Sequence, residues 1–227
     1  MNKTNPRIAI IDYKLSNLFS VKHACEFVGM NAEITSSRDD VLNADGAILP
    51  GVGAFGDAMK NLENLNLVSA IKEFVKSGKP LMGICLGLQL LFSESEEFGP
   101  HKGLGIIPGK VVKFPSINSD GRVIKVPQIG WNTIHTPDSD PLKWQNTPLL
   151  GIADGEFMYF VHSYYIIPDN TRDVLTTTTY DTITYASSIL HDNVIAFQFH
   201  PEKSGIEGVK IYKNWALHLK KLNNPNI

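Results

Sequence analysis

Short apolar runs and amphipathic segments alternate through the first hundred residues of the chain. The apolar runs at 7–12, 46–50 and 81–85 have the length of buried strands. Apolar residues recur at helical spacing after each run, and the predicted helices cover 16–29, a segment through Met59, Leu62 and Leu65, 67–77 and 86–97. Strands that alternate with helices in this way indicate parallel βαβ units, with helices on both faces of one sheet.

The pattern changes after residue 103. Short β-rich runs separated by turns replace the alternation, and they fall at 111–114, 123–126, 159–161, 174–178, 184–187 and 194–199. A final helix is expected at about 206–222. The sequence therefore predicts an α/β fold and a single domain over residues 1–227, in which the second half adds antiparallel strands to a mostly parallel sheet.

Composition and charge narrow the classes of function. Lys and Arg total 21 and Asp and Glu total 23, so the formal charge is −2. Because both signs are spread along the chain, no nucleic acid and no membrane surface is expected as a partner. No apolar stretch approaches the ~20 residues of a membrane-spanning helix, and the N-terminus carries no signal-peptide pattern. Two cysteines are too few for a disulfide framework, so the expected location is cytoplasmic.

The sharpest chemical signal is the sequence Gly-Ile-Cys-Leu-Gly at 83–87, which follows a predicted strand and opens a predicted helix. This arrangement is typical of a nucleophile elbow, with Cys85 where a hydrolase carries serine. The tight turn leaves no room for side chains two positions before and two after the nucleophile. The N–H groups that begin the helix favour a thiolate. Cys25, in contrast, lies among apolar residues of a predicted helix, and we expect it to be a core residue.

A cysteine nucleophile needs a base, and the base usually needs a third group that orients it. His200 ends the apolar run VIAFQFH and is followed by Pro201 and Glu202. Side chains two positions apart in an extended segment point the same way, so Glu202 can hold one ring nitrogen of His200 while the other faces Cys85. Pro201 favours an extended His200. The sequence therefore predicts a Cys-His-Glu triad.

The oxyanion that forms when a thiolate attacks an amide needs backbone N–H donors. Leu86, directly after the predicted nucleophile, supplies one candidate N–H. The glycine-rich turn at 51–56 supplies a second, because the glycines on both sides of Val52 let that peptide rotate at low cost.

The same turn reads G-x-G-x-x-G and so also matches a dinucleotide-binding fingerprint. It lies in the second strand–helix unit rather than the first, and Glu73, about 20 positions on, falls in a predicted helix. Cys and His never occur at paired metal-ligand spacing. We therefore expect no cofactor and no metal. A non-catalytic binding module stays as an alternative, although it leaves Cys85, His200 and Glu202 unexplained.

Four segments together resemble the class I glutamine amidotransferases: PGVGAFGDAM at 50–59, GICLGLQLLF at 83–92, FVHSYY at 160–165 and QFHPEKSG at 198–205. GxCxGxQ and FHPE mark that class. PGVGAFGDAM and VPQIGWN resemble, more narrowly, its glutaminase subunits of imidazole glycerol phosphate synthase. The resemblance runs from about residue 7 to the C-terminus and implies a flavodoxin-like arrangement of the mostly parallel sheet.

The resemblance implies a role for each matching residue. Cys85 attacks the side-chain amide of L-glutamine and forms a glutamyl thioester, while His200 moves the proton and Glu202 orients His200. The residues expected to form the oxyanion hole are Val52, Gly53 and Leu86, and those expected to hold glutamine are Gln89, Glu97, Ser163 and Tyr164.

The resemblance also implies a partner protein. Free ammonia is protonated in water and then no longer acts as a nucleophile, so a synthase must receive it directly. In the family that partner is a (β/α)₈-barrel cyclase, which forms a heterodimer with the glutaminase and makes imidazole glycerol phosphate and an aminoimidazole carboxamide ribotide in histidine biosynthesis. The residues expected at this interface are Asn17, Pro127, Gln128, Ile129, Gly130 and Trp131.

Two segments depart from the family pattern. The first turn reads DYKLSNL at 12–18, where the family usually has two glycines, and PQIGWN at 127–132 lacks the usual His and Met. Two alternatives therefore stay open. One is a related glutaminase that supplies ammonia to sugar amidation for surface polysaccharides, and the other is a stand-alone Cys-triad amide hydrolase that works without a partner.

Overall fold

The structure, a computed structural model, describes residues 5–15, 17–140 and 142–223, and strands alternate with helices through its first part. The elements of this part are β1 (Arg7–Ile11), α1 (Leu18–Phe27), β2 (Asn31–Thr35), α2 (Arg38–Asn43), β3 (Gly46–Gly51), α3 (Phe55–Asn64), α4 (Leu67–Lys76), β4 (Leu81–Cys85) and α5 (Leu86–Leu90). The three strands predicted here are confirmed as β1, β3 and β4, while β2 and α2 are elements that the sequence pattern did not single out.

The second part is mainly β-structure. Its strands are β5 (Phe92–Ser95), β6 (His101–Lys102), β7 (Ile107–Lys113), β8 (Gln128–Ile134), β9 (Glu156–His162), β10 (Tyr164–Pro168), β11 (Val174–Tyr180), β12 (Ile183–His191) and β13 (Val194–Phe197). Three 3₁₀ turns, η1 (Pro137–Ser139), η2 (Thr171–Asp173) and η3 (Pro201–Lys203), and the long helix α6 (Gly205–Asn223) complete it. None of the helices in the described part of the chain is both long and apolar enough to cross a membrane.

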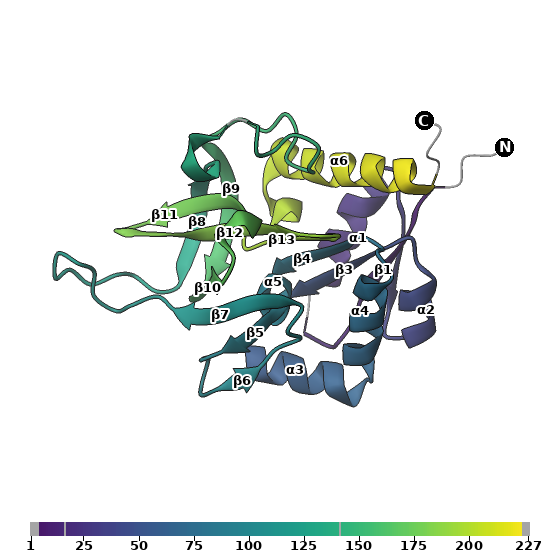
Figure 1. The fold of residues 1–227 in the computed structure, drawn as a ribbon, viewed down its shortest axis with the longest axis horizontal. Coiled ribbons are helices and arrows are strands. Elements are labelled where there is room, and N and C mark those ends of the chain that lie inside the picture. The colour runs from purple at the N-terminus through teal and green to yellow at the C-terminus, as the bar shows by residue number, and fades with distance from the viewer. Residues whose placement is uncertain (1–4, 16, 141, 224–227) are drawn as a thin grey trace.

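One large sheet joins the two parts in the order β2-β1-β3-β4-β13-β12-β10-β7-β5-β6, with β11 paired to β12 (Figure 1). Neighbours from β2 to β13 are all parallel. The strands that follow in the order, β12, β10 and β7, pair antiparallel. β8 and β9 form a separate antiparallel pair. The predicted fold class is therefore confirmed: a mostly parallel α/β sheet carries antiparallel strands from the C-terminal half.

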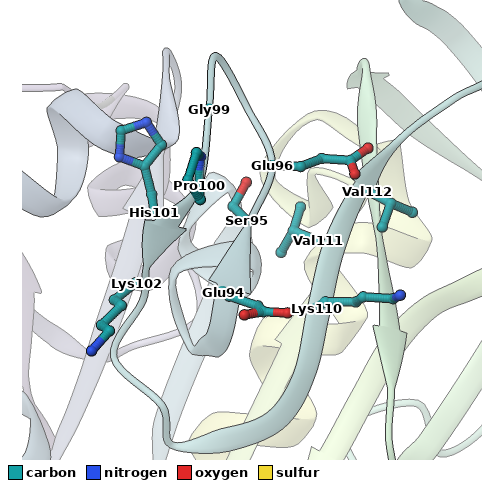
Figure 2. Close-up of a pocket in the computed structure, with 10 residues that line it drawn as sticks. All are labelled: Glu94, Ser95, Glu96, Gly99, Pro100, His101, Lys102, Lys110, Val111 and Val112. Atoms are coloured by element: carbon teal, nitrogen blue, oxygen red, sulfur yellow. The ribbon is translucent and has the colours of Figure 1, made fainter.

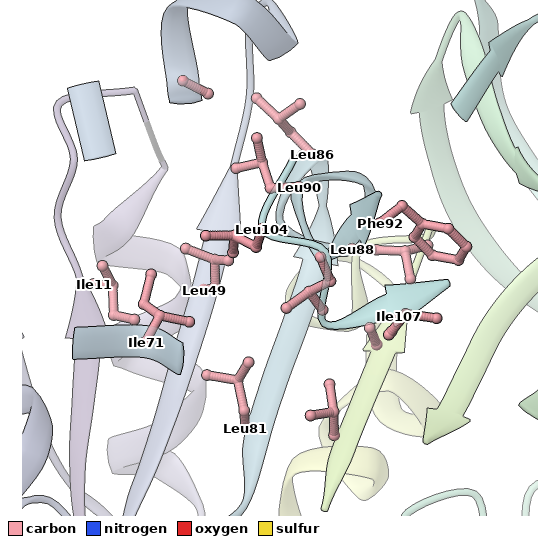
Figure 3. Packing of buried hydrophobic residues seen from close by; sticks show 14 of the residues in the cluster. Ile11, Leu49, Ile71, Leu81, Leu86, Leu88, Leu90, Phe92, Leu104 and Ile107 are labelled. Carbon is pink, nitrogen blue, oxygen red and sulfur yellow. The ribbon is translucent and has the colours of Figure 1, made fainter. Parts of the chain in front are cut away.

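Helices cover both faces of the parallel strands because successive side chains of each strand point to opposite faces. Leu49 and Leu81 pack into one cluster, together with apolar residues of α2, α3 and α4 (Figure 3). Their chain neighbours Ile48 and Met82 pack into the other cluster, against α1 and α6. Every residue of β3 and β4 is consequently buried, which explains why these strands read as unbroken apolar runs.

The parallel pairing brings three chain segments together at one edge of the sheet. Gly51 at the end of β3 is the register partner of Cys85 at the end of β4. Phe197 at the end of β13 pairs with Ile84. The glycine-rich turn, the cysteine elbow and the segment that leads to His200 therefore emerge side by side, at the carboxyl ends of the strands where ligands bind in open α/β sheets.

The helix predicted over 86–97 is wrong beyond its first turn and a half. α5 ends at Leu90, and Phe92–Ser95 form β5, which pairs with β7 through Glu94 and Lys110. Leu86 to Phe92 are all buried, so the apolar run has no exposed face that could distinguish a helix from a strand. The strand depends on a partner that lies far along the chain.

The strand predicted at 123–126 is also wrong. Val123 forms an isolated bridge with Ile117, outside the strands of the described chain, and its side chain is exposed. This segment belongs to the long loop between β7 and β8, which projects from the body of the molecule (Figure 1). Its apolar residues satisfy the strand pattern, but a strand forms only where a neighbouring strand pairs with it.

A hollow of about 550 Å³ lies where β5, β6 and β7 meet (Figure 2). Glu94 and Lys110 are register partners on neighbouring strands of its floor, and His101 stands at its rim. Ser95 is its buried polar residue, and its hydroxyl already accepts a hydrogen bond from Glu97 N at 3.2 Å. Although larger than the pocket at Cys85, this hollow does not contain the predicted nucleophile or base.

Candidate active site

Cys85 sits at a strained turn between β4 and α5. Its φ is +54° and its ψ −111°, a conformation that costs a side-chain-bearing residue about 1–3 kcal/mol and is typical of functional sites. The flanking glycines make the turn possible. A Cβ on Gly87 would lie 1.7 Å from the carbonyl oxygen of Leu49, and a Cβ on Gly83 would lie 3.0 Å from the Cβ of Ala196. Both positions are therefore too crowded for a side chain, as the elbow pattern predicts.

His200 and Glu202 form a buried pair beside the elbow. His200 Nδ1 lies 2.7 Å from Glu202 Oε1, and both side chains are almost fully buried. The other ring nitrogen, Nε2, is buried and makes no hydrogen bond of normal geometry among the described residues, and Cys85 lies near the ring. His200 is extended as predicted, but the chain then enters the 3₁₀ turn η3, so Glu202 reaches the ring through a turn rather than along a strand.

Two hydrogen bonds hold the backbone of His200. His200 N donates to Tyr159 O at 2.9 Å, and Ser204 Oγ donates to His200 O at 2.6 Å. Burial opposes a charge on the ring, but the neighbouring Cys85 and Glu202 favour the imidazolium and together raise the pKa of His200 to about 10. A protonated ring at neutral pH, next to a cysteine, is the charge arrangement of an activated thiolate.

The pocket at Cys85 has a volume of about 270 Å³. It unites residues that lie far apart in the sequence, and its lining is Val52, Gly53, Cys85, Leu86, Gln89, Glu97, Pro127, Val161, His162, Ser163 and Tyr164. All residues predicted for the oxyanion hole and for glutamine binding are among them. His200 and Glu202 are not part of this lining, and their side chains are almost fully buried.

The predicted oxyanion donors differ in whether their backbone N–H groups already donate a hydrogen bond within the protein. Leu86 is the first residue of α5, so its N–H has no acceptor within the helix. Gly53, with φ of +103°, lies across the pocket on the glycine-rich turn. The N–H of Val52, however, donates to Leu15 O at 3.1 Å and is therefore already occupied.

Gln89 is buried and its amide nitrogen is fully used inside the protein. Nε2 donates to Tyr164 O at 2.9 Å and to Gln198 Oε1 at 3.0 Å. A ligand in the pocket can therefore meet only the carbonyl oxygen of Gln89, which accepts hydrogen bonds.

Glu97 follows β5 and turns toward the start of α3. Its Oε2 accepts a hydrogen bond from Phe55 N at 2.6 Å, at the first residue of that helix. Burial raises the pKa of Glu97 above its ordinary value, although the Phe55 N–H opposes this by favouring the carboxylate. Burial and the carboxylates of Glu97 and Glu96 also raise the pKa of the Tyr164 hydroxyl.

His162 is a buried structural residue rather than a second base. Nδ1 lies 2.8 Å from Tyr164 O, and Nε2 lies 3.1 Å from the hydroxyl of Tyr185. Burial lowers the pKa of His162 to about 4, so the ring is neutral at pH 7. The Tyr185 hydroxyl in turn donates to Gln128 Oε1 at 3.0 Å, which links β8 to the lining of the pocket.

The residues predicted at a partner interface are not all on the surface. Ile129 and Trp131 are 62% and 56% exposed on β8, and Pro127 is also exposed. Gly130 and Asn17 are half-buried. Gln128 is only 2% exposed, because strand alternation turns it toward the core, where it meets Tyr185.

The sequence reasoning missed Gln198 and Val161. Gln198 Nε2 donates to Cys85 Sγ at 3.8 Å, and Sγ lies 3.7 Å from Val161 O. A signal for Gln198 was present, because it precedes His200 by two positions in the apolar run VIAFQFH, where alternate side chains of an extended chain share one side. Val161 lies within the FVHSYY segment but was given no role there; in the structure it pairs with Ile129 of β8 and lines the pocket.

Comparison with known proteins places this geometry in a family. The model of the family "Glutamine amidotransferase class-I" matches residues 9–219. Imidazole glycerol phosphate synthase subunit HisH of Aquifex aeolicus is 48% identical, over 95% of this chain and 99% of that protein. The protein of the same name from Syntrophotalea carbinolica is also 48% identical, over 92% of this chain and 98% of that protein.

Solved structures agree on the fold. The structure of PurLQS from Thermotoga maritima superimposes with a TM-score of 0.65 at 21% identity, over 95% of this chain and 99% of that chain. The chain described here belongs to the class I glutamine amidotransferase family and, within it, to the HisH subunits of imidazole glycerol phosphate synthase.

Proposed function

We propose that this protein hydrolyses L-glutamine to L-glutamate and ammonia and delivers the ammonia to a synthase partner. The observation that carries the proposal is a strained cysteine that opens a helix beside a buried His–Glu pair, at the base of a pocket. The relatives named HisH support it, since they are subunits of imidazole glycerol phosphate synthase. The family match over 9–219 and the pairing of β4 with β13 support one glutaminase domain over 1–227.

Cys85 is the proposed nucleophile. Its thiol proton passes to the buried Nε2 of His200, and the thiolate attacks the amide carbon of the glutamine side chain. The imidazolium then protonates the departing nitrogen, so that ammonia leaves and a glutamyl thioester stays on Cys85. Glu202 keeps Nδ1 protonated throughout and stabilises the charged ring. Water, deprotonated by His200, hydrolyses the thioester.

The negative oxygen of both tetrahedral intermediates is assigned to backbone donors. Leu86 and Gly53 both line the pocket, and their N–H groups are the proposed donors. Val52 N–H joins them only if its bond to Leu15 O is released, and the glycine at position 53 beside it makes that rotation inexpensive. A partner that favours the rotated peptide would thus switch on hydrolysis.

Four lining residues are proposed to hold the substrate. The carboxylate of Glu97 and the carbonyl oxygen of Gln89 accept hydrogen bonds, which suits the α-ammonium group and the amide hydrogens of glutamine. Ser163 and Tyr164 offer hydroxyl and backbone groups for its α-carboxylate. Charge-assisted bonds at the α-carbon end would leave the side-chain amide at Cys85.

The proposed partner is a (β/α)₈-barrel cyclase that uses ammonia to make imidazole glycerol phosphate and an aminoimidazole carboxamide ribotide in histidine biosynthesis. Its docking surface is proposed on the outer face of β8 and β9, where Ile129 pairs with Val161 and Trp131 with Tyr159. Ile129, Trp131 and the nearby Phe157 are more than half exposed. Because Val161 also lines the pocket, this apolar face is continuous with the pocket mouth.

The test is glutamate release from L-glutamine by the purified chain, alone and with the barrel cyclase of histidine biosynthesis and its ribotide ligand. We expect strong stimulation by the cyclase and loss of all activity in Cys85→Ala. Stimulation only by the cyclase-like protein of a polysaccharide pathway would move the protein to that pathway. Vigorous turnover without any partner would overturn the delivery of ammonia and favour a stand-alone hydrolase.

A further inference from the structure

A chain of buried amides connects the backbone of Tyr164 to the sulfur of Cys85. Gln89 Nε2 donates to Tyr164 O at 2.9 Å and to Gln198 Oε1 at 3.0 Å. Gln198 Nε2 then donates to Cys85 Sγ at 3.8 Å. Gln198 is completely buried directly after β13, two positions before His200.

The direction of this chain is fixed at its far end. Tyr164 O is a backbone carbonyl and can only accept hydrogen bonds, so Gln89 must present its nitrogen to it. That nitrogen then requires an acceptor on Gln198, which places Oε1 of Gln198 toward Gln89 and Nε2 toward Cys85. An inverted Gln198 amide would set two N–H donors against each other. Gln198 is therefore locked with its N–H groups toward the sulfur.

We infer that Gln198 is a further catalytic residue, whose amide N–H stabilises the thiolate of Cys85 and holds its sulfur in the attacking position. The inference rests on the proposed glutaminase function. In the neutral thiol, Sγ can donate to Val161 O at 3.7 Å, but a thiolate has no proton to give. Loss of the proton to His200 therefore leaves the Gln198 N–H as a charge-assisted donor to the sulfur.

The surroundings strengthen this bond. Gln198, His200 and Cys85 are all buried, and a hydrogen bond to a charged atom gains strength when water is excluded. Because the amide is already oriented by Gln89, no reorganisation is needed when the thiolate forms. The same amide also holds Gln89, so Gln198 connects nucleophile activation with the residue that faces the substrate.

Two substitutions separate these two roles. Gln198→Glu keeps an oxygen acceptor for Gln89 but presents no N–H to Cys85, whereas Gln198→Met removes both groups at similar length. The matched control is Asn193→Asp, the same amide-to-acid change just before the opposite end of β13, where Asn193 bonds Val75 O and Lys79 O. Each full-length variant is first checked by its thermal unfolding midpoint.

The decisive measurement is the rate at which iodoacetamide alkylates Cys85, followed by mass spectrometry from pH 5 to 10. We expect both Gln198 variants to shift the midpoint of the pH profile upward by about one pH unit. At a pH below the midpoint, this corresponds to alkylation that is about tenfold slower than in wild type. Asn193→Asp should leave the midpoint unchanged. Gln198→Met should in addition raise the KM for glutamine, measured with the partner present, while Gln198→Glu should mainly lower kcat.

The inference would be overturned if both Gln198 variants had the same alkylation midpoint as wild type and Asn193→Asp. If Gln198→Glu does not fold, Gln198→Met still decides the question. Alkylation needs no glutamine, so the two proposals fail separately. Suppose that the wild-type protein releases no glutamate, but the alkylation midpoints of the Gln198 variants are still shifted. This result would disprove the glutaminase function and leave the thiolate-stabilising role of Gln198 intact.

Discussion

The elbow around Cys85 and the middle of α1 around Cys25 are two buried cysteine environments with opposite chemistry. The two residues are 6% and 0% exposed, so burial alone hardly separates them. Cys85 has a positive φ, opens a helix and lies beside His200. Cys25 has helical geometry, and burial and then Glu26 raise the pKa of its thiol well above its usual range.

The difference shows that backbone placement, rather than depth in the protein, prepares a cysteine for reaction. At the elbow the chain turns so that the sulfur meets the amide N–H of Gln198 and lies beside His200, whose pKa is raised. In α1 the backbone N–H groups are consumed by the helix, and the thiol packs against apolar neighbours such as Val21.

The largest expected effect is the loss of glutaminase activity in Cys85→Ala, by at least about 10⁴-fold, because the covalent intermediate can no longer form. Cys25→Ala should retain activity within about twofold. Both are measured as glutamate release in the presence of the cyclase partner. Equal losses in the two variants would contradict the distinction between the two regions.

The next effect concerns the group that orients the base. Glu202→Gln should lower kcat by about 10³-fold, because an amide neither fixes the ring tautomer nor stabilises the imidazolium. Glu207→Gln serves as the control, since Glu207 forms a more exposed ion pair with Lys210 at 3.1 Å in α6. A Glu202 variant as active as the control would show that His200 does not depend on this pairing.

The elbow itself should tolerate no added methyl group. Gly87→Ala is expected to lower the free energy of unfolding by about 3 kcal/mol or more, because its Cβ would meet the Leu49 carbonyl at 1.7 Å. In Gly56→Ala the new Cβ meets the ring of His101, which can move, and the cost should be smaller. Urea unfolding of the two variants measures both costs, and similar values would contradict the packing argument.

Two buried histidines near Cys85 make the free energy of unfolding depend on pH, and the two dependences have opposite signs. The pKa of His162 is lowered to about 4, so between pH 6.5 and 4 the unfolded chain binds a proton that the folded chain does not, and stability falls as pH falls. The pKa of His200 is raised to about 10, so its contribution is complete below pH 6.5 and is lost as pH rises to about 10.

Across its range His162 should contribute about 3 kcal/mol and His200 about 5 kcal/mol. The measurement is the free energy of unfolding in urea at pH 4, 6.5 and 10. His162→Gln should flatten the acid side of the curve, and His200→Gln the alkaline side. If a variant keeps the wild-type change in unfolding free energy over the pH range of the histidine that it lacks, that histidine does not contribute as proposed.

The smallest effect is expected in α1. Cys25→Ala should cost about 1 kcal/mol of stability, the amount typical for removal of one small buried group from a core. Its activity and the pH profile of Cys85 alkylation should match those of wild type. A changed profile would show that the two cysteine regions communicate.

Much of the site could be predicted because its chemistry is concentrated in short local motifs. Gly83, Cys85 and Gly87 define the elbow within one turn, and His200 and Glu202 lie two positions apart. The parallel core was equally predictable, because strands buried on both faces read as unbroken apolar runs.

The features that escaped prediction depend on partners distant in sequence. β5 exists because it pairs with β7, whereas residues 123–126 pair with no strand of the described chain. The orientation of Gln198 is fixed through Gln89 by the carbonyl of Tyr164. No short segment of the sequence contains both partners of these contacts.

The sequence by itself determined the alternation of strands and helices and the identity of the reactive groups, since periodicity and turn sterics act over a few residues. Only the tertiary structure decided which N–H groups face the sulfur, that the Val52 N–H is engaged by Leu15, and that Gln128 points inward. The physical reason is that hydrogen-bond satisfaction is settled among all buried neighbours at once, and those neighbours are chosen by the pairing of strands across the whole sheet.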